Sequence, residues 1–231
     1  MIIYALIMIA ENLKSVTQRI ARSCEKVGRS PGDVTLICVT KEASISQVEE
    51  ALGAGAKNLG ENRVQGLVAK HKIAGDRAAW HLVGHLQTNK VKDAVKIASL
   101  IHSVDSIRLA KEIDKEAARI GKVQDILIQL NTSGEKTKFG LAPDTVQDFI
   151  KEVAIYNNIS IKGLMTIAPE VADPEIVRPY FRKLKELSDE INDPRSTIHD
   201  PRILSMGMTN DFEVAIEEGS TMVRIGRAIF G

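Results

Sequence analysis

The sequence predicts a single (β/α)8 barrel of the TIM type with an extra N-terminal helix, and two observations carry this prediction. Eight short apolar runs, the first of them rich in β-branched residues, alternate with segments of helical periodicity. Such runs are typical of parallel strands buried on both faces, and the repeated order places a helix after each strand. No Gly/Ser-rich or Pro-rich linker divides the 231 residues, so we expect one domain over residues 1–231.

The elements follow in order along the chain. An amphipathic helix, about residues 9–27, ends at Gly28 and precedes the first strand. Residues 1–8 are apolar but too few to span a membrane, and we expect a disordered or extension segment with Met8 as an alternative start. The predicted strands cover residues 34–40, 58–60, 80–83, 101–104, 125–130, 161–167, 203–205 and 222–225.

Three of the intervening helices carry readable start signals. Ser44 has Gln47 at capping-box spacing, and Ser106 precedes another helical run. A third start lies at residues 173–174, where a proline suits the first helical position, and Pro179 should kink or restart the helix that follows. An open doubly wound sheet is the alternative, but the turn after the first strand lacks the G-x-G-x-x-G pattern of a dinucleotide site.

Composition narrows the classes of function. Lys and Arg total 31 against 30 for Asp and Glu, so the net charge of +1 lacks the basic footprint of a nucleic-acid binder. Cys24 and Cys38 have neither metal-ligand spacing nor a disulfide framework, which favours the cytoplasm. We therefore expect no metal, no nucleic acid and no membrane partner.

Lys41 ends the first apolar run, at the strand end where barrels carry their chemistry. Burial there would lower the pKa of the lysine and favour the free amine, which attacks aldehydes to form a Schiff base. The alternative is that Lys41 begins a loop and is solvated. The loops after strands seven and eight, residues 205–211 and 224–227, suit a phosphate because they combine hydroxyls, glycines and a helix start.

These features together fit pyridoxal 5'-phosphate (PLP), whose aldehyde, phosphate and ring nitrogen would each have a partner. Arg224 cannot easily give up its proton, so a hydrogen bond to the pyridine nitrogen would leave that nitrogen unprotonated and make the ring a weak electron sink. Such a site disfavours reactions that need a long-lived carbanion, and it suits proton exchange or storage.

Eight stretches in one order resemble a known family over nearly the whole chain. They are VTK (39–41), GENRVQ (60–65), HLVGHLQTNK (81–90), HSVDS (102–106), NTSGEKTKFGL (131–141), GLMTI (163–167), SMGMTND (205–211) and VRIGRAIFG (223–231). The sequence thereby resembles the pyridoxal phosphate homeostasis proteins, single-domain relatives of the alanine racemase N-terminal barrel.

The resemblance implies specific roles for site residues. Lys41 would carry PLP as an internal aldimine, Arg224 would face the pyridine nitrogen, and Asn62 would lie near the ring. Ser205, Gly226 and the backbone of Arg227 would hold the phosphate. Many relatives have Thr or Ser where this chain has Arg227, so a side-chain hydroxyl contact to phosphate is not expected at that position.

The resemblance also implies a function: a protein that carries or buffers PLP in vitamin B6 and amino-acid homeostasis and is not an enzyme. Apo PLP-dependent enzymes would be its recipients, and we expect a cytoplasmic monomer. The first alternative is a single-domain amino-acid racemase. Racemisation needs acid/base groups on both faces of the substrate carbon, and Lys41 serves only one. In the similar racemase a second domain supplies the other, and this chain ends at Gly231. A Schiff-base aldolase is the more distant alternative.

Four further residues have open roles. His81 is expected to pack in the core, and His85 to lie near the cofactor mouth. Glu61 would either orient a neighbour or cap the helix that starts after it. Lys138 would contact a substrate carboxylate, form a secondary aldehyde adduct or remain solvated.

Overall fold

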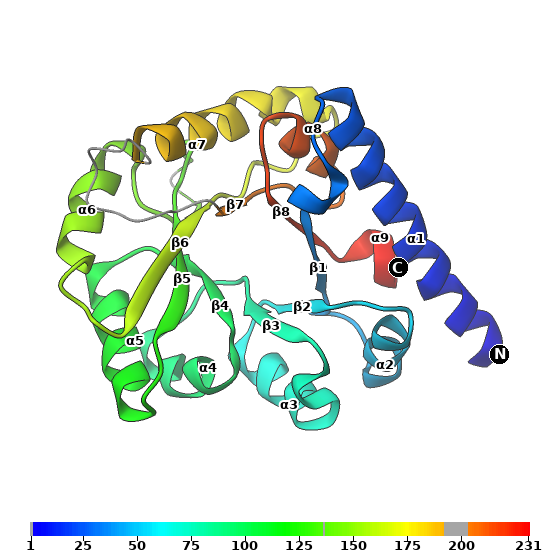
Figure 1. Ribbon diagram of the computed structural model, residues 1–231, viewed down its shortest axis with the longest axis horizontal. Helices are drawn as coiled ribbons and strands as arrows, with labels where there is room; N and C mark the ends of the chain where they lie inside the picture. The colour runs from blue at the N-terminus through cyan, green and yellow to red at the C-terminus, as the bar shows by residue number, and fades with distance from the viewer. Residues whose placement is uncertain (1, 136, 192–202) are drawn as a thin grey trace.

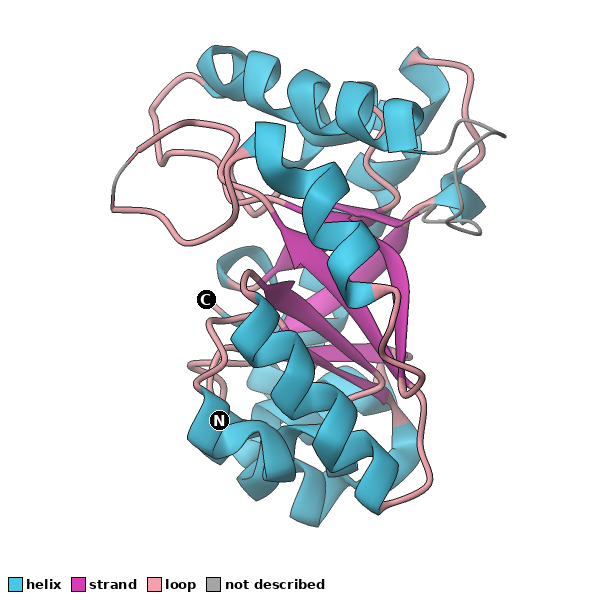
Figure 2. Ribbon diagram, turned by 90° about the vertical axis from the view of Figure 1, so that its left-hand side faces the viewer, coloured by secondary structure: helices cyan, strands magenta, loops and turns pink. Residues whose placement is uncertain are grey.

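The strands form a closed parallel barrel, which confirms the predicted fold class. The computed structural model describes residues 2–135, 137–191 and 203–231, with the backbone alone for residues 2–7. Each strand pairs with the next along the chain, and β8 pairs with β1 to close the barrel. Figure 1 shows the helices around the outside of the strands, and Figure 2 shows the strands between them in the perpendicular view.

Each strand begins and ends within two residues of its predicted bounds. The strands are β1 (Thr35–Val39), β2 (Asn58–Glu61), β3 (Ala79–Leu82), β4 (Leu100–Val104), β5 (Gln124–Gln129), β6 (Ile159–Met165), β7 (Ile203–Ser205) and β8 (Met222–Ile225). The apolar run that ends at Lys41 is longer than its strand, because β1 stops at Val39 and Lys41 lies in the turn that follows.

The helices of the described residues are α1 (Ile2–Lys26), α2 (Ile45–Gly53), α3 (Val64–Ala74), α4 (Val91–Ile97), α5 (Ile107–Arg119), α6 (Val146–Val153), α7 (Arg178–Ile191), α8 (Phe212–Glu217) and α9 (Arg227–Phe230). Five 3-10 turns accompany them: Pro31–Asp33, Gly75–Arg77, Thr88–Lys90, Pro143–Thr145 and Pro174–Val177. Within these residues no helix has both the length and the apolar character needed to cross a bilayer.

The predicted helix starts are confirmed. Ser44 and Gln47 form a capping box at the start of α2, and the Ser106 side chain accepts a hydrogen bond from a backbone N–H of α5. Asp173 caps the 3-10 turn, and α7 restarts at Arg178, one residue before Pro179. Helix α1 begins at Ile2 rather than near Ile9, so the predicted start was wrong: the helical backbone also includes residues 2–8. The assignment of residues 1–8 to an extension stays a prediction.

Two apolar layers lie on opposite faces of the strands. The larger cluster joins the outer strand faces to the helices. The smaller contains residues of the strands and of the segments that directly follow them, and no helix residues, so it lies inside the barrel. Its buried members are Ile37, Val83, Leu100, Leu127, Met165 and Met222. Polar side chains share the interior with these residues, and they position much of the site described below.

The N-terminal helix docks on the last helices of the chain. Asn12 Nδ2 donates to the Ile229 carbonyl of α9 at 3.1 Å. Arg19 makes two hydrogen bonds to the Glu213 carboxylate of α8 and lies over the Phe212 ring, 4.6 Å from its centroid. Helix α1 therefore covers the seam where the first and last strands meet (Figure 1).

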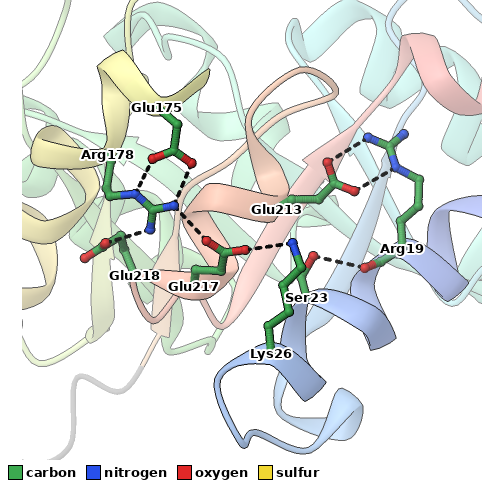
Figure 3. A network of polar contacts seen from close by, with 8 residues as sticks. All are labelled: Arg19, Ser23, Lys26, Glu175, Arg178, Glu213, Glu217 and Glu218. Atoms are coloured by element: carbon green, nitrogen blue, oxygen red, sulfur yellow. Dashed lines mark hydrogen bonds and ion pairs between the residues drawn. The ribbon is translucent and has the colours of Figure 1, made fainter. Parts of the chain in front are cut away.

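An ion network fixes α7 against α8 and α1. Figure 3 shows Arg178 between three carboxylates, those of Glu175, Glu217 and Glu218, while Lys26 of α1 reaches Glu217 from the other side. Hydrogen bonds from Arg178 and Lys26 lower the pKa of Glu217 below its ordinary value of 4.5. Hydrogen bonds from Arg182 and Arg178 lower the pKa of Glu218 below its ordinary value.

Because these pKa values are lowered on folding, the network stabilises the protein above pH 4.5, where the carboxylates would be ionised in the unfolded chain as well. The stabilisation is lost as the pH falls through the lower folded pKa values. We expect Arg178→Met to reduce the free energy of unfolding by about 1 kcal/mol at pH 7, and by much less at pH 3. Urea unfolding at the two pH values measures the difference. Lys151→Met, which removes an exposed pair with Asp148, is the control and should change little. An equal loss at both pH values would contradict the expectation.

Candidate functional site

A cavity of about 460 Å³ opens at the carboxyl ends of the strands. Its lining residues come from the ends of the strands or from the loops that follow them. They are Val39, Lys41, Glu42, Asn62, Val83, Gly84, Lys138, residues 167–171, Pro174, residues 208–211, Arg224, Gly226 and Arg227. This is the end of the barrel at which enzymes of this fold carry their active sites.

Lys41 lines the cavity but is less buried than the sequence analysis expects. Its side chain is 47% exposed, and Nζ lies 3.5 Å from a carboxylate oxygen of Glu42. The reason is its position in the turn beyond β1, where no strand covers it. The amine is therefore accessible from the cavity and from solvent.

The backbone before Lys41 is held by a buried ion pair. Lys70 of α3 donates to the Glu61 carboxylate at 2.5 Å and also to the Thr40 carbonyl. The Thr40 hydroxyl donates to the same Glu61 oxygen at 2.6 Å. Of the two roles open to Glu61, the structure shows orientation of neighbours, because no side chain caps the start of α3. The three residues anchor the turn that presents the amine.

Arg224 lies in the cavity wall with little exposure to solvent. Its guanidinium donates to the Ser205 hydroxyl at 2.6 Å and to the Thr166 carbonyl at 2.9 Å. Burial lowers the pKa of Arg224 to about 10, and the Asp211 carboxylate opposes this shift. The guanidinium thus stays protonated at neutral pH and can only donate hydrogen bonds.

The loop after β7 forms one side of the cavity. Met208, Thr209 and Asn210 line it, and Asp211 accepts a hydrogen bond from the Met208 N–H at 2.6 Å. Burial raises the pKa of Asp211, and the Met208 hydrogen bond and Arg224 oppose that shift. This carboxylate fixes the loop, a role that the sequence analysis does not assign. The sequence feature that could have indicated this role is the position of Asp211 at the end of the SMGMTND stretch.

Ser205 lies apart from the cavity surface. It is fully buried, and its hydroxyl contacts Arg224 and His102 in the barrel interior. The cavity-lining hydroxyl of this loop belongs to Thr209 instead. Alternation along a strand accounts for the difference, because Ser205 is still within β7 and faces inward, whereas Thr209 lies in the loop.

The other predicted site residues line the cavity together with Lys41. Asn62 follows β2, and Gly226 and Arg227 follow β8. The Arg227 guanidinium pairs with the Glu170 carboxylate, in the loop after β6, at 2.9 Å. These positions are those that the sequence analysis expects near a bound cofactor, and their role in binding stays a prediction.

The loop after β5 is held by a ring contact outside the cavity lining. Phe139 stacks on His85, with ring centroids 4.1 Å apart and an interplanar angle of 15°. Asp105 lies 3.8 Å from the His85 imidazole. The stack places His85 beside the loop that brings Lys138 to the cavity. Among the described residues, no group of three or more His, Cys, Asp or Glu side chains is placed to hold a metal ion.

Comparison with known proteins agrees with this arrangement. The family described as alanine racemase, N-terminal domain, matches residues 11–231. The pyridoxal phosphate homeostasis protein of Aquifex aeolicus (strain VF5) is 44% identical over 222 residues, which are 96% of each chain. The protein of the same name from Pseudomonas aeruginosa is 34% identical over 224 residues, 96% of this chain and 95% of the relative.

Solved structures show the same fold. The structure of PipY from Synechococcus elongatus PCC7942 with PLP bound has a TM-score of 0.83 and 32% identity, and covers 96% of this chain and 100% of its own. An alanine racemase of Clostridium difficile 630 has a TM-score of 0.73 at 17% identity, over 96% of this chain and 56% of its own, and shows the fold alone. The chain therefore belongs to the alanine racemase N-terminal domain family and, within it, to the pyridoxal phosphate homeostasis proteins.

Proposed function

We propose that this protein binds PLP through Lys41 and stores it for other proteins. One observation carries the proposal: an accessible amine, a buried guanidinium and the loops after β7 and β8 line the same cavity. The relatives named pyridoxal phosphate homeostasis protein and the PLP-bound PipY structure support it.

The cavity fits the group in size and in chemistry. Its volume of about 460 Å³ lies in the range of small-molecule sites. When bound, PLP supplies an aldehyde that condenses with an amine and releases water. Lys41 would supply that amine, and Arg224 would donate a hydrogen bond toward the ring nitrogen. Backbone groups of Gly226 and Arg227 and of the loop around Thr209 would hold the phosphate.

We further propose that the protein is a carrier rather than an enzyme. The Arg224 guanidinium keeps its proton, so it would leave the ring nitrogen unprotonated, and this disfavours carbanion chemistry. The curated relatives are named for homeostasis. The likeness to alanine racemases, at 17% identity, supports the fold and not the reaction. The recipients would be apo enzymes that use PLP. The free, buried Cys24 and Cys38 suit a cytoplasmic protein, and we propose that the protein is a monomer.

Borohydride reduction followed by peptide mass spectrometry tests the proposal. We expect the wild-type protein, incubated with PLP, to gain one pyridoxyl group on the peptide that contains Lys41. Lys41→Ala should lose this label and the visible absorbance that accompanies it, while its circular dichroism stays unchanged. Lys162→Ala is a matched control, because Lys162 is 41% exposed but lies outside the cavity.

Other labelling patterns would contradict the assignment. A pyridoxyl group on Lys138, which also lines the cavity, would make Lys138 the attachment site. A protein without any pyridoxyl group that traps a sugar phosphate would be an aldolase. Sustained deuterium exchange at the Cα of free amino acids, at enzymatic rates, would favour the racemase.

A further inference from the structure

A line of hydrogen-bonded side chains crosses the inside of the barrel. Arg224 Nη1 contacts Ser205 Oγ at 2.6 Å, and Ser205 Oγ contacts His102 Nδ1 at 2.9 Å. His102 Nε2 lies 3.0 Å from His81 Nδ1, and His81 Nε2 lies 3.3 Å from Asn58 Oδ1. The line passes from β8 and β7 to β4, β3 and β2.

These groups lie in the interior, where each polar atom needs a partner. Ser205 and His102 have no exposed surface, and His81 and Arg224 are 5% and 4% exposed. Only Arg224, at one end of the line, belongs to the cavity lining. Ser205, His102 and His81 are buried away from both the cavity and bulk solvent, and Asn58 at the far end is partly exposed outside the cavity. These residues therefore act on the site through Arg224.

The direction of each hydrogen bond in the line follows from the group at its first end, the Arg224 guanidinium. A guanidinium only donates, so Ser205 Oγ accepts from Arg224. The described residues offer the Ser205 proton a single further partner, His102 Nδ1. His102 therefore carries its proton on Nε2 and donates it to His81 Nδ1. His81 in turn carries its proton on Nε2 and donates it to Asn58, whose amide oxygen accepts. The reverse direction would leave the Ser205 proton buried without an acceptor, at a cost that proteins avoid.

The environment of the two imidazoles supports this order. Burial lowers the pKa of His81 to about 4, and it lowers the pKa of His102 well below the ordinary value, with His81 and Arg224 adding to the shift. Both rings are therefore neutral at pH 7, and each has one donor and one acceptor nitrogen, as the line requires.

We propose that Ser205 and His102, backed by His81 and Asn58, are positioning residues that hold the Arg224 guanidinium in the cavity wall, with both imidazoles fixed as Nε2–H tautomers. The hydroxyl of Ser205 thus serves the arginine and not the phosphate. The part of the proposal that concerns PLP rests on the proposed function, and the part that concerns the tautomers does not.

The tautomers are measured by two-bond ¹H–¹⁵N NMR correlation on the protein without cofactor at pH 7. We expect His81 and His102 to show the Nε2–H pattern and to keep it across the neutral pH range. In Ser205→Ala the His102 Nδ1 resonance should move toward that of an imidazole nitrogen without a donor. Ser220→Ala is the matched control: Ser220 is equally buried and neighbours β7 and β8, but its hydroxyl contacts only backbone carbonyls. An Nδ1–H tautomer or a charged ring in either histidine would overturn the proposal.

The consequence for the site is measured by PLP titration. We expect Ser205→Ala and His102→Leu to raise the dissociation constant about tenfold and to shift the absorbance maximum, because Arg224 loses its fixed orientation. His102→Asn keeps an acceptor for the Ser205 hydroxyl and should recover most of the affinity, and Ser220→Ala should bind as the wild type does. Unchanged affinity and spectrum in Ser205→Ala would overturn the positioning role. A wild-type protein that does not bind PLP would instead overturn the proposed function, while the tautomers would still be tested by NMR.

Discussion

Lys70→Met is expected to lower the free energy of unfolding by about 3–5 kcal/mol, because it leaves the Glu61 carboxylate buried without its cation. The Glu61 side chain is 3% exposed and that of Lys70 is 10% exposed. Removing the ammonium also takes away the donor to the Thr40 carbonyl. Urea unfolding monitored by circular dichroism gives the free energy.

A double-mutant cycle separates the pair from its surroundings. Glu61→Gln keeps an amide oxygen for the Thr40 hydroxyl and removes the charge, so Glu61→Gln/Lys70→Met should recover most of the stability lost in Lys70→Met. A double variant as unstable as the sum of the two single variants would show that the ion pair is not the cause. Because Lys41 follows Thr40 directly, we also expect Lys70→Met to weaken PLP retention.

Gly163→Ala is expected to prevent normal pairing of β6 with β7. The free energy of unfolding should fall by more than about 4 kcal/mol. A Cβ at this position would lie 1.9 Å from the Ile203 carbonyl oxygen, and 2.7 and 2.8 Å from the Ile203 carbonyl carbon and amide nitrogen. Those atoms belong to the backbone of β7, the strand that pairs with β6 here, so no rotamer change relieves the clash. The φ of +152° adds strain for a residue with a side chain.

Soluble yield and thermal unfolding test this expectation. Gly53→Ala is the control, because Gly53 ends α2 in a conformation open to any residue and a Cβ there meets nothing within 4 Å. Its stability should change by no more than about 1 kcal/mol. A Gly163→Ala protein that unfolds at the wild-type temperature would contradict the expected clash between β6 and β7.

The strands could be predicted because each is specified locally. A short run of mostly apolar residues is visible within three to seven residues of sequence. Ser44, Gln47 and Pro179 mark helix boundaries through the properties of close neighbours in the chain. The positions of Lys41 and of the loops after β7 and β8 could be predicted for the same reason, because each follows the end of a strand.

The contacts that orient the site could not be predicted in this way. Lys70 has the sequence context of a solvated helix residue, and its burial depends on how α3 packs over Thr40. Ser205 and His102 are 103 residues apart, and they meet only because β4 and β7 face each other across the closed barrel. Whether Ser205 faces the cavity or the interior depends on where β7 ends, and a shift of one residue reverses the answer.

The docking of α1 has a consequence for the order of folding during synthesis. Asn12 bonds to Ile229 and Arg19 to Glu213, separations of 217 and 194 residues, and β1 has β8 as one of its two neighbours. While the ribosome is still adding residues, the first helix and strand have emerged but lack these partners. The amphipathic face of α1 and one edge of β1 therefore remain uncovered until residues 212–231 have been added, so this closure is a late step in the folding of the barrel.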